Sequence, residues 1–473
     1  MRASSILPLA AGFIGASAIH LVPRTDGSAP RVIQHDIQRK QVENPLENDR
    51  ARLRKREGKT VSVDLANEET LYFMNVTIGT PSQSLRLHID TGSSDLWVNV
   101  ASSQLCEKQA NPCSASGTYA PNSSSTYEYI NSEFNISYVD GSGAYGDYVS
   151  DVVSFGGISI DHQEFGIGYS SSSMEGLIGI GYPINEALVA YSGGRTYANV
   201  PQSLVENGDI NSNAYSLWLN DLDASTGSIL FGGVNTGKYT GALKTVPIIK
   251  DEGAVYAEFI IALTGVGANG QSGSIATNFA VEALLDSGSS LMYLPDDIAT
   301  AIFQSVGAQY DSSEGVAIVD CSLADSDDTI DFTFSDPTIQ VAMRELVIVA
   351  GYNGNTPVCI LGISPAGSST PVLGDTFLRS AYVVYDIANN EISLAQTNFN
   401  STTNNILEIT KTDGVPGAAT VTNAVTAVSA QGTDGARIGG VTLSGESFAA
   451  PTAAVDSRLA LIGAVGAMAF FAA

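Results

Sequence analysis

One unusual phrase occurs twice in this chain. HIDTGSSDLWV runs from His88 to Val98, and ALLDSGSSLMYL runs from Ala283 to Leu294. In each copy an aspartate follows an apolar run and precedes a small turn, two serines and further apolar residues. A single Asp-Thr-Gly or Asp-Ser-Gly is an ordinary turn. The apolar flanks predict instead that Asp90 and Asp286 end buried strands, where an isolated charge is costly.

The repetition extends beyond the two aspartates. GLIGIGYP contains Gly179, 89 residues after Asp90, and PVLGDTFL contains Gly374, 88 residues after Asp286. Apolar-apolar-Gly triplets are common, but here they follow a repeated phrase at nearly equal distances. The pattern therefore predicts two lobes of similar topology.

The chain between about Leu65 and Thr397 is predicted to be mainly β. Short alternating runs such as TLYFMNVTIG, YVSDVVSFGGISI and AYVVYDIANNEISLAQ are separated by Gly, Asn, Asp and Ser, as strands and hairpins are. Helical spacing is confined to VPQSLVENG from Val200 and LPDDIATAIFQSVGAQ from Leu294. Acids at the start of the second segment suit the positive end of a helix dipole.

Two buried aspartates that lie together can perform acid–base chemistry that a single aspartate cannot. If the lobes bring Asp90 and Asp286 together, like-charge repulsion makes one carboxyl keep a proton while the other ionises. The ionised carboxylate can accept a proton from water while its neighbour donates to an amide carbonyl, which hydrolyses the amide without a covalent intermediate. Gly92 and Gly288 permit close backbone approach, and the hydroxyls of Thr91 and Ser287 can join the two loops.

Residues 65–400 resemble the pepsin-like aspartic proteases of the A1 family. HIDTGSSDLWV, ALLDSGSSLMYL and VLGDTFLRSAYVVYDIANNEISLA carry the resemblance. It implies two related β-rich lobes with a central cleft, Asp90 and Asp286 as catalytic dyad, and Ser93 as hydrogen-bond donor to the first aspartate. It also implies that Thr91 and Ser287 brace the two loops.

The resemblance implies a flap hairpin in NISYVDGSGAYGDY. Tyr138 matches the flap tyrosine and Trp97 matches the tryptophan that hydrogen-bonds it, although both aromatics also suit core packing. Val139 replaces the family's usual glycine. Asp140, followed by Gly141, matches an acid associated with basic residues before the scissile bond in fungal relatives, and a plain turn aspartate is the equal alternative. His88 replaces an apolar residue and is expected to be a satisfied buried histidine.

Several other classes of function are disfavoured. After Arg56 the chain holds 12 basic against 44 acidic residues, a net charge of −32, which disfavours nucleic-acid binding. His88 and His162 are the only histidines there, and no GxSxG or HExxH occurs. We therefore expect no serine triad, no metal and no cofactor. A non-catalytic pepsin-fold binding protein of the cell surface is the alternative function.

Both ends have the composition of processing segments. The predicted organisation is a signal peptide at 1–18, a pro-segment at 19–56 ending in the basic Arg54-Lys55-Arg56, an N-terminal lobe at 57–247, a C-terminal lobe at 248–400, a flexible Ser/Thr-rich stalk at 401–447 and a GPI-attachment signal at 448–473. A transmembrane tail is the alternative for the fifteen apolar residues from Leu459.

Cysteines and sequons agree with secretion. Four cysteines allow three pairings, and proximity along the chain favours Cys106–Cys113 and Cys321–Cys359. Sequons predict N-glycosylation of Asn75, Asn122, Asn135 and Asn400, of which Asn75, inside a predicted strand, is the weakest. With the GPI-like tail the chain resembles the fungal yapsins. We expect a monomeric, GPI-anchored cell-surface aspartic endopeptidase, active on peptides or proteins at acidic pH.

Overall fold

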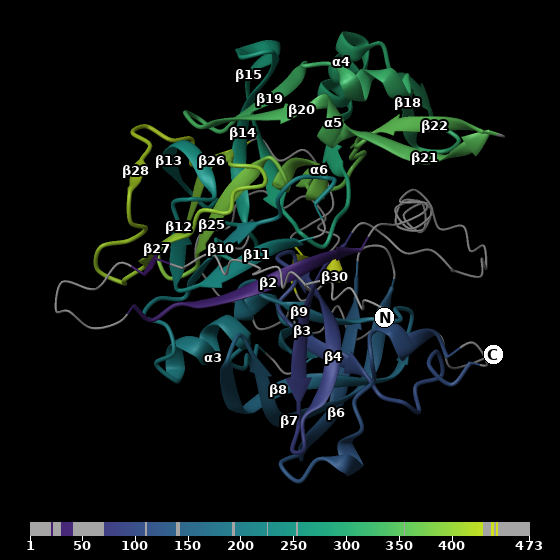
Figure 1. Ribbon diagram of the computed structural model, residues 1–473, viewed down its shortest axis with the longest axis vertical. Coiled ribbons are helices and arrows are strands. Elements are labelled where there is room, and N and C mark those ends of the chain that lie inside the picture. The colour runs from purple at the N-terminus through teal and green to yellow at the C-terminus, as the bar shows by residue number, and fades with distance from the viewer. Residues whose placement is uncertain are drawn as a thin grey trace, which may run out of the picture.

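The computed structural model describes residues 20–21, 30–40, 71–108, 111–138, 142–191, 194–224, 226–251, 254–353, 355–428, 437–438 and 441–442. These residues form two β-rich lobes, one above the other in Figure 1, with further strands between them. The prediction of a mainly β fold with two lobes is confirmed. The predicted signal peptide and GPI signal lie outside the described residues.

A single sheet of 14 strands runs through the lower lobe and the middle of the molecule. In sheet order its strands are β28 (Ala418–Thr420), β13 (Tyr239–Pro247), β26 (Glu391–Thr397), β25 (Ala381–Asp386), β10 (Ala214–Trp218), β11 (Thr226–Phe231), β2 (Ile33–Lys40), β3 (Leu71–Ile78), β4 (Gln83–Asp90), β9 (Gly176–Gly179), β5 (Leu96–Asn99), β8 (Ile158–Ser171), β7 (Gly143–Phe155) and β6 (Glu128–Ser137).

The upper lobe contains two smaller sheets. The seven-stranded sheet is β20 (Thr338–Ala342), β19 (Thr329–Thr333), β14 (Ile260–Ala268), β15 (Gln271–Leu285), β24 (Val372–Leu373), β16 (Met292–Leu294) and β23 (Ile363–Pro365). The four-stranded sheet is β17 (Gln309–Asp311), β18 (Val316–Val319), β22 (Thr356–Leu361) and β21 (Val347–Asn353). Elsewhere lie the three-stranded sheet β1 (His20–Leu21), β27 (Asn405–Glu408), β12 (Gly233–Asn235) and the pair β29 (Arg437–Ile438), β30 (Val441–Thr442).

Helices are short and few, as predicted. In the described part of the chain they are α2 (Ala187–Tyr191), α3 (Val200–Glu206), α4 (Asp296–Val306), α5 (Met343–Leu346), α6 (Asp375–Leu378) and the 3₁₀ turns η1 (Pro112–Ala115), η2 (Pro121–Ser123), η3 (Pro183–Asn185) and η4 (Cys321–Asp325). Both predicted helices, α3 and α4, are present. Among the residues described, no helix combines the length and apolarity needed to cross a membrane.

The predicted duplication appears as two matching runs of strands. In the first lobe the order is β3-β4-β9-β5-β8, and in the second it is β14-β15-β24-β16-β23. Successive pairs are antiparallel, parallel, antiparallel and parallel in both runs. Asp90 ends β4 and Asp286 follows β15, so the two aspartates occupy equivalent places in the two lobes.

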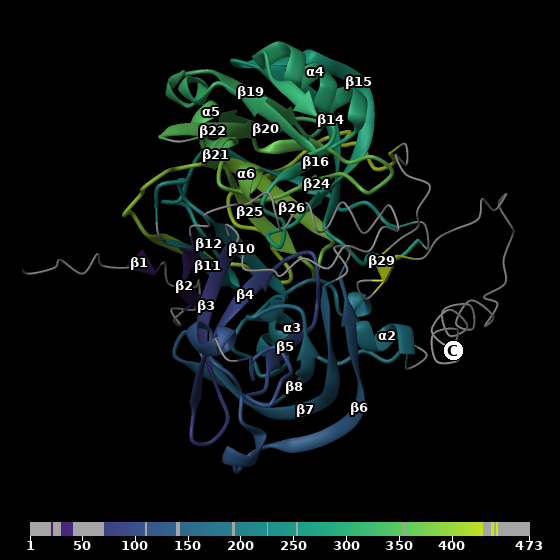
Figure 2. The ribbon, with the colours of Figure 1, turned by 90° about the vertical axis from the view of Figure 1, so that its right-hand side faces the viewer.

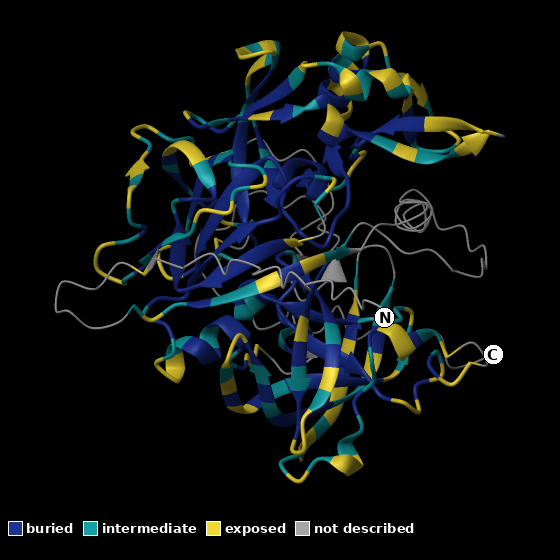
Figure 3. Ribbon diagram, in the orientation of Figure 1, coloured by how far each residue is buried: buried dark blue, intermediate teal, exposed yellow. Residues whose placement is uncertain are grey.

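Strand alternation explains where the core lies. In β3 the side chains of Met74, Val76 and Ile78 are buried, whereas Asn75 is exposed and Thr77 is half-buried. Successive side chains of a strand point to opposite faces, so one face of β3 packs inward and the other faces solvent. Figure 3 shows the same division over the molecule, with buried ribbons inside and exposed ones at the rims.

The structure corrects the flexible-stalk prediction for residues 401–428. β27 pairs with β12 and β1, and β28 pairs with β13. Ile406 and Ile409 are buried in this segment, and Val425 N–H donates to Ser335 Oγ (3.0 Å). A Ser/Thr-rich stretch therefore belongs to the folded body because its few apolar residues pack. Most of 429–447 lies outside the described residues.

Strands from both predicted lobes share the large sheet. β25 pairs with β10, and β26 pairs with β13, across the predicted boundary at residue 247. β2, which comes from the predicted pro-segment, pairs with β11 on one side and β3 on the other. Figure 2 shows β2, β10, β11, β25 and β26 between the two lobes.

Candidate active site

The two repeated aspartates meet where the lobes meet. Both are buried, at 6% and 7% exposure for Asp90 and Asp286. A Cβ built on Gly92 would lie 2.5 Å from Asp286 Oδ1, and one built on Gly288 would lie 2.5 Å from Asp90 Oδ1. Each glycine thus leaves the room into which the opposite carboxylate fits, as the sequence predicted.

Each carboxylate is held by the same two donors of its own loop. Gly92 N–H donates to Asp90 Oδ1 (2.8 Å), and Ser93 Oγ donates to Asp90 Oδ2 (2.5 Å). In the second lobe Gly288 N–H and Ser289 Oγ donate to Asp286 Oδ1 and Oδ2, both at 2.8 Å. These donors fix the orientation of both carboxylates while leaving further acceptor capacity on each oxygen.

Ser289 is a site residue that sequence reasoning missed. It follows Asp286 by three positions, as Ser93 follows Asp90, and it makes the equivalent hydrogen bond. The repeated phrase itself carried the signal, because DTGSS and DSGSS place a serine at the same offset.

Thr91 and Ser287 join the two loops by reciprocal hydrogen bonds. Ser287 N–H donates to Thr91 Oγ1 (2.9 Å), and Thr91 N–H donates to Ser287 Oγ (3.2 Å). The hydroxyls donate onward, from Thr91 to the Leu285 carbonyl (2.9 Å) and from Ser287 to the Ile89 carbonyl (3.0 Å). This arrangement matches the predicted brace and holds the loops in one relative position.

Burial raises the pKa of Asp90, and the adjacent Asp286 charge raises it further. The Ser93 hydroxyl and Gly92 N–H oppose that shift by stabilising the ionised form. The pair therefore keeps a shared proton to a higher pH than an isolated aspartate would. A carboxyl that donates beside a carboxylate that accepts is the combination needed for acid–base hydrolysis.

The flap contact has the predicted partners. Trp97 Nε1 donates to Tyr138 Oη (2.7 Å), and Tyr138 packs against the buried cluster that contains Trp97, Phe134 and Tyr148. Tyr138 N–H donates to the Ser142 carbonyl (2.8 Å) at the end of the hairpin formed by β6 and β7. Val139, Asp140 and Gly141 lie outside the described residues, so their predicted roles stay predictions.

His88 lies beside the dyad loops without joining the dyad. It is buried, its ring contacts Phe73 (5.7 Å between centroids), and its Nε2 lies 3.4 Å from the Ser287 carbonyl oxygen. These contacts agree with the expected satisfied, buried histidine.

The remaining sequence predictions concern covalent and surface sites. Disulfides join Cys106 to Cys113 and Cys321 to Cys359, the favoured pairing. The four sequon asparagines, Asn75, Asn122, Asn135 and Asn400, are all exposed. Asn400 lies in a turn at φ 54°. In the described part of the chain, no group of three or more His, Cys, Asp or Glu could hold a metal ion.

The comparisons with known proteins agree with this geometry. Residues 71–397 match the family model described as eukaryotic aspartyl protease. The chain is 56% identical to a probable aspartic-type endopeptidase OpsB of Aspergillus oryzae, over 92% of this chain and 90% of that one. It is 40% identical to candidapepsin-3 of Candida albicans, over 74% and 85% of the two chains.

A solved structure supports the fold independently. The aspartic proteinase of Irpex lacteus superposes with a TM-score of 0.59 at 20% identity, covering 79% of this chain and all of that one. At that identity the likeness concerns the fold alone. The family model, the curated relatives and the paired aspartates lead to one assignment: the chain belongs to the eukaryotic aspartyl protease family.

Proposed function

We propose that this protein is a secreted, cell-surface aspartic endopeptidase that cleaves peptide bonds at acidic pH. The observation that carries the proposal is the matched pair of carboxylates, each held by a glycine N–H and a serine hydroxyl at equivalent strand ends. A binding protein of the same fold has no need for two buried aspartates that share one site, since burying them is costly.

The dyad performs both proton transfers of hydrolysis. The ionised carboxylate accepts a proton from water, and the oxygen of that water forms a bond to the amide carbon. The protonated carboxyl donates to the carbonyl oxygen, which gives a neutral tetrahedral diol. Proton transfer to the amide nitrogen then allows its bond to carbon to break. Ser93 and Ser289 hold the carboxylates in place throughout.

The raised pKa of Asp90 sets the direction of the pH dependence. The dyad requires one proton in total, so activity is lost when the pH rises through the raised pKa and that proton leaves. At low pH activity is lost when the second carboxyl also protonates. A bell-shaped profile on the acidic side of neutrality is expected.

Asp140 is proposed to favour basic residues before the scissile bond. Its place two residues past the flap tyrosine and the net charge of −32 after Arg56 support this, because a carboxylate offsets the desolvation of a lysine or arginine. The Asp140→Ala variant should lose cleavage after Lys relative to cleavage after Leu. An unchanged ratio would assign Asp140 to the turn alone.

The chain is proposed to be made as a zymogen. β2, from the predicted pro-segment, lies in the large sheet between β11 and β3, where it pairs with residues 226–231 and 71–73. Cleavage after Arg56 would separate this strand from the chain that carries the dyad. We expect an Arg54→Ala/Lys55→Ala/Arg56→Ala variant to be secreted uncleaved and inactive, whereas active uncleaved protein would contradict the zymogen proposal.

The enzyme is proposed to be a GPI-anchored glycoprotein monomer at the cell surface. The signal-like 1–18, the GPI-like 448–473 and the sequons support this location. Release by phosphatidylinositol-specific phospholipase C and light scattering of the released protein test the anchor and the monomer. Protein that stays in the medium without an anchor would contradict surface attachment.

A peptide-library digest tests the activity itself. The processed enzyme is incubated with the library between pH 4 and 6, with and without pepstatin, a transition-state-like inhibitor of aspartic proteases. Cleavage that pepstatin abolishes is expected. Bound but uncleaved peptides would favour the non-catalytic alternative.

A further inference from the structure

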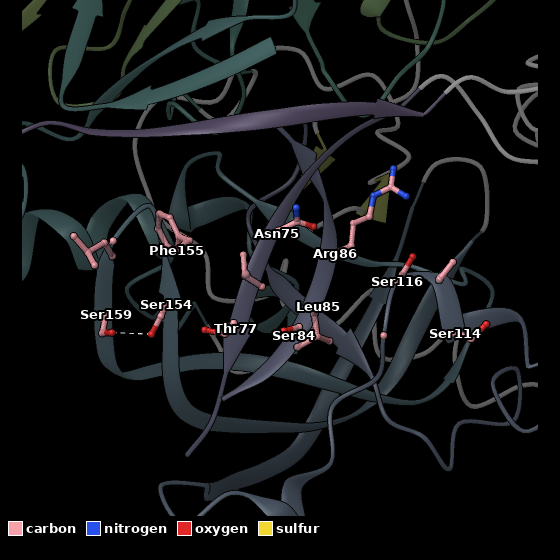
Figure 4. A pocket seen from close by; sticks show the side chains of 15 residues that line it. Asn75, Thr77, Ser84, Leu85, Arg86, Ser114, Ser116, Ser154, Phe155 and Ser159 are labelled. Carbon is pink, nitrogen blue, oxygen red and sulfur yellow. Dashed lines mark hydrogen bonds between the residues drawn. The ribbon is translucent and has the colours of Figure 1, made fainter. Parts of the chain in front are cut away.

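A trough of about 720 Å³ lies on the outer face of the first lobe, over β3, β4, β7 and the start of β8 (Figure 4). Residues 114–117 form its other wall. Neither dyad aspartate lines it, so it is separate from the site described above. Its size falls within the range of pockets that hold small organic molecules.

The floor of the trough is a row of hydroxyl groups. Ser159 lies opposite Ser154, Ser154 opposite Thr77, and Thr77 opposite Ser84, each pair directly across neighbouring strands. Residues in such pairs point to the same face, with Cβ atoms about 5 Å apart. Ser154 and Ser159 are joined by a 2.7 Å hydrogen bond, which Figure 4 shows. Four strands thus present one hydroxyl each.

The charge of the lining points to a neutral, polyhydroxylated ligand. No carboxylate lines the trough, and Arg86 is the one charged side chain among the lining residues. The Arg86 guanidinium lies 4.2 Å from the centre of the Phe73 ring, an attractive cation–π contact. A row of hydroxyls beside one cation can donate to and accept from the hydroxyl groups of a sugar ring.

The sequon itself identifies the occupant. Asn75 and Thr77 of Asn75-Val76-Thr77 both line the trough, and both point to the outer face of β3 because Val76 between them is buried. Asn75 is exposed and lies directly opposite Arg86. A sugar attached to Asn75 would begin at the edge of the hydroxyl row, with no diffusion step needed to bring it there.

We propose that Asn75 carries an N-linked oligosaccharide whose first sugars are seated in this trough. The Asn75 side-chain nitrogen loses a proton and bonds to C1 of the first N-acetylglucosamine, while the bond from that carbon to the lipid diphosphate of the donor breaks. The lipid diphosphate leaves. The proposal rests on the proposed entry into the secretory pathway, where this donor is found.

Asn122 provides a matched control. It is a sequon asparagine of the same lobe, it is exposed in η2, and it does not line the trough. The full chain is secreted from a eukaryotic host, and occupancy at both sites is measured by glycopeptide mass spectrometry. Peptide N-glycosidase F is then added to native and to denatured protein, and the rate of release is followed at each asparagine.

A seated glycan is expected at Asn75, with native release at least about fivefold slower than at Asn122 and equal release after denaturation. The Ser154→Ala/Ser159→Ala variant should bring native release at Asn75 toward the Asn122 rate, with release at Asn122 unchanged. The measurement on wild type stands even if this variant folds poorly.

Two results would overturn the proposal. They are an unmodified Asn75 beside a modified Asn122, or equal native release at the two sites. If no sequon carries a glycan, the proposed entry into the secretory pathway is contradicted as well. If other sequons carry glycans and only Asn75 fails the test, the proposed seat alone is contradicted.

Discussion

Asp90 and Asp286 each accept from one backbone N–H and one serine hydroxyl, so the two oxygens of each carboxylate have different neighbours. The Oδ1 atoms are the ones that the opposite glycine makes room for. The Oδ1 atoms therefore face each other across the lobe boundary, and the serines hold the Oδ2 atoms. This asymmetry places the shared proton between the lobes.

The hydrogen bond from Trp97 to Tyr138 is expected to hold the flap tyrosine for catalysis. Trp97→Phe removes the donor, and Tyr138→Phe removes the acceptor. Loss of one hydrogen bond of about 1–1.5 kcal/mol should lower kcat/KM by roughly tenfold in either variant. Peptide kinetics measure it. The double variant should be no worse than either single one, and additive losses would show that the two side chains act separately.

The hydroxyl of Ser287 is expected to stabilise the joined loops. Ser287→Ala leaves the Thr91 N–H and the Ile89 carbonyl without this partner in a buried place. A loss of about 2–4 kcal/mol in the free energy of unfolding follows, measured by urea denaturation. Ser287→Thr keeps the hydroxyl, as Thr91 does in the first loop, and should unfold near the wild-type midpoint. Equal midpoints for both variants would contradict the brace.

Most residues of the candidate active site could be predicted from local sequence patterns. Asp90, Asp286, Thr91 and Ser287 were predictable because the duplicated phrase encodes both the turn and its burial. The role of Asp140 could not be decided between substrate binding and a plain turn. Val139 departs from the family's usual glycine, and an exposed hairpin tip has no alternation of buried and exposed residues from which a role could be predicted.

At the scale of elements, a buried acid cluster lies between the loop before β5 and α2. Asp95 accepts from Ala187 N–H (2.7 Å), Tyr197 Oη (3.0 Å) and Tyr148 Oη (3.1 Å). Glu186 accepts from Tyr197 N–H (2.9 Å), and its Oε1 is buried with no hydrogen-bond partner among the described residues. Tyr148 and Tyr197 belong to the cluster against which Tyr138 packs.

Burial, followed by the Asp95 charge, raises the pKa of Glu186 to about 10, from 4.5. Burial raises the pKa of Asp95 to about 6, from 3.8. The folded state therefore binds more protons than the unfolded state. This contribution to stability is fully present below pH 4 and is lost as the pH rises, from about 4 to 6 for Asp95 and from about 4.5 to 10 for Glu186.

Glu186→Gln should flatten the decline of stability with pH. The wild type is expected to lose up to about 1.4 kcal/mol per pH unit from Glu186 between pH 5 and 8. Glu133→Gln, an exposed change in the same lobe, should leave the wild-type slope unchanged. Thermal unfolding of the three proteins across this range measures the slopes. Equal slopes for wild type and Glu186→Gln would refute the assignment.

Some elements escaped prediction for compositional reasons. β2 lies in a basic leader that matches a solvated charge run, although Ile33 and Ile37 are buried on one face. β27 and β28 lie among Ser, Thr, Ala and Gly, whose low apolar content is typical of linkers. Pairing with strands that are distant along the chain stabilises these segments. A local sequence pattern cannot show which distant strand a segment will pair with.

At the scale of the whole molecule, one sheet connects the lobes, and β28 from residues 401–428 pairs with an edge of that sheet. β13, β25 and β26 continue into β10, β11 and β2, and then into the strands that carry Asp90. β28 adds to the far edge, where Val421 N–H donates to the Thr245 carbonyl (2.9 Å). In the uncleaved chain this continuity holds the lobes, and hence the two aspartates, in one relative position. The pairing of β13, β26, β25, β10 and β11 does not involve β2 and is kept when the proposed cleavage after Arg56 separates that strand.

Truncation should show that residues 401–428 are part of the enzyme. A chain ending at Asn400 loses the burial of Ile406 and Ile409, which is worth roughly 3–6 kcal/mol together. It should be secreted poorly or unfold at a lower temperature than a chain ending at Val428. Both truncations lack the predicted anchor and are directly comparable. Identical yield and unfolding temperature would restore the flexible-stalk interpretation.

Asp90 and Asp286 are proposed to act together to hydrolyse peptide bonds. The direct measurement compares wild type with Asp286→Asn, both cleaved after Arg56 by an added protease so that self-processing is not required, with the new N-terminus verified. Cleavage of a fluorogenic peptide is followed at pH 4 to 5, with equal thermal unfolding as the control for folding. We expect at least about a 100-fold loss of kcat in the variant. Undiminished cleavage by correctly folded Asp286→Asn would contradict it.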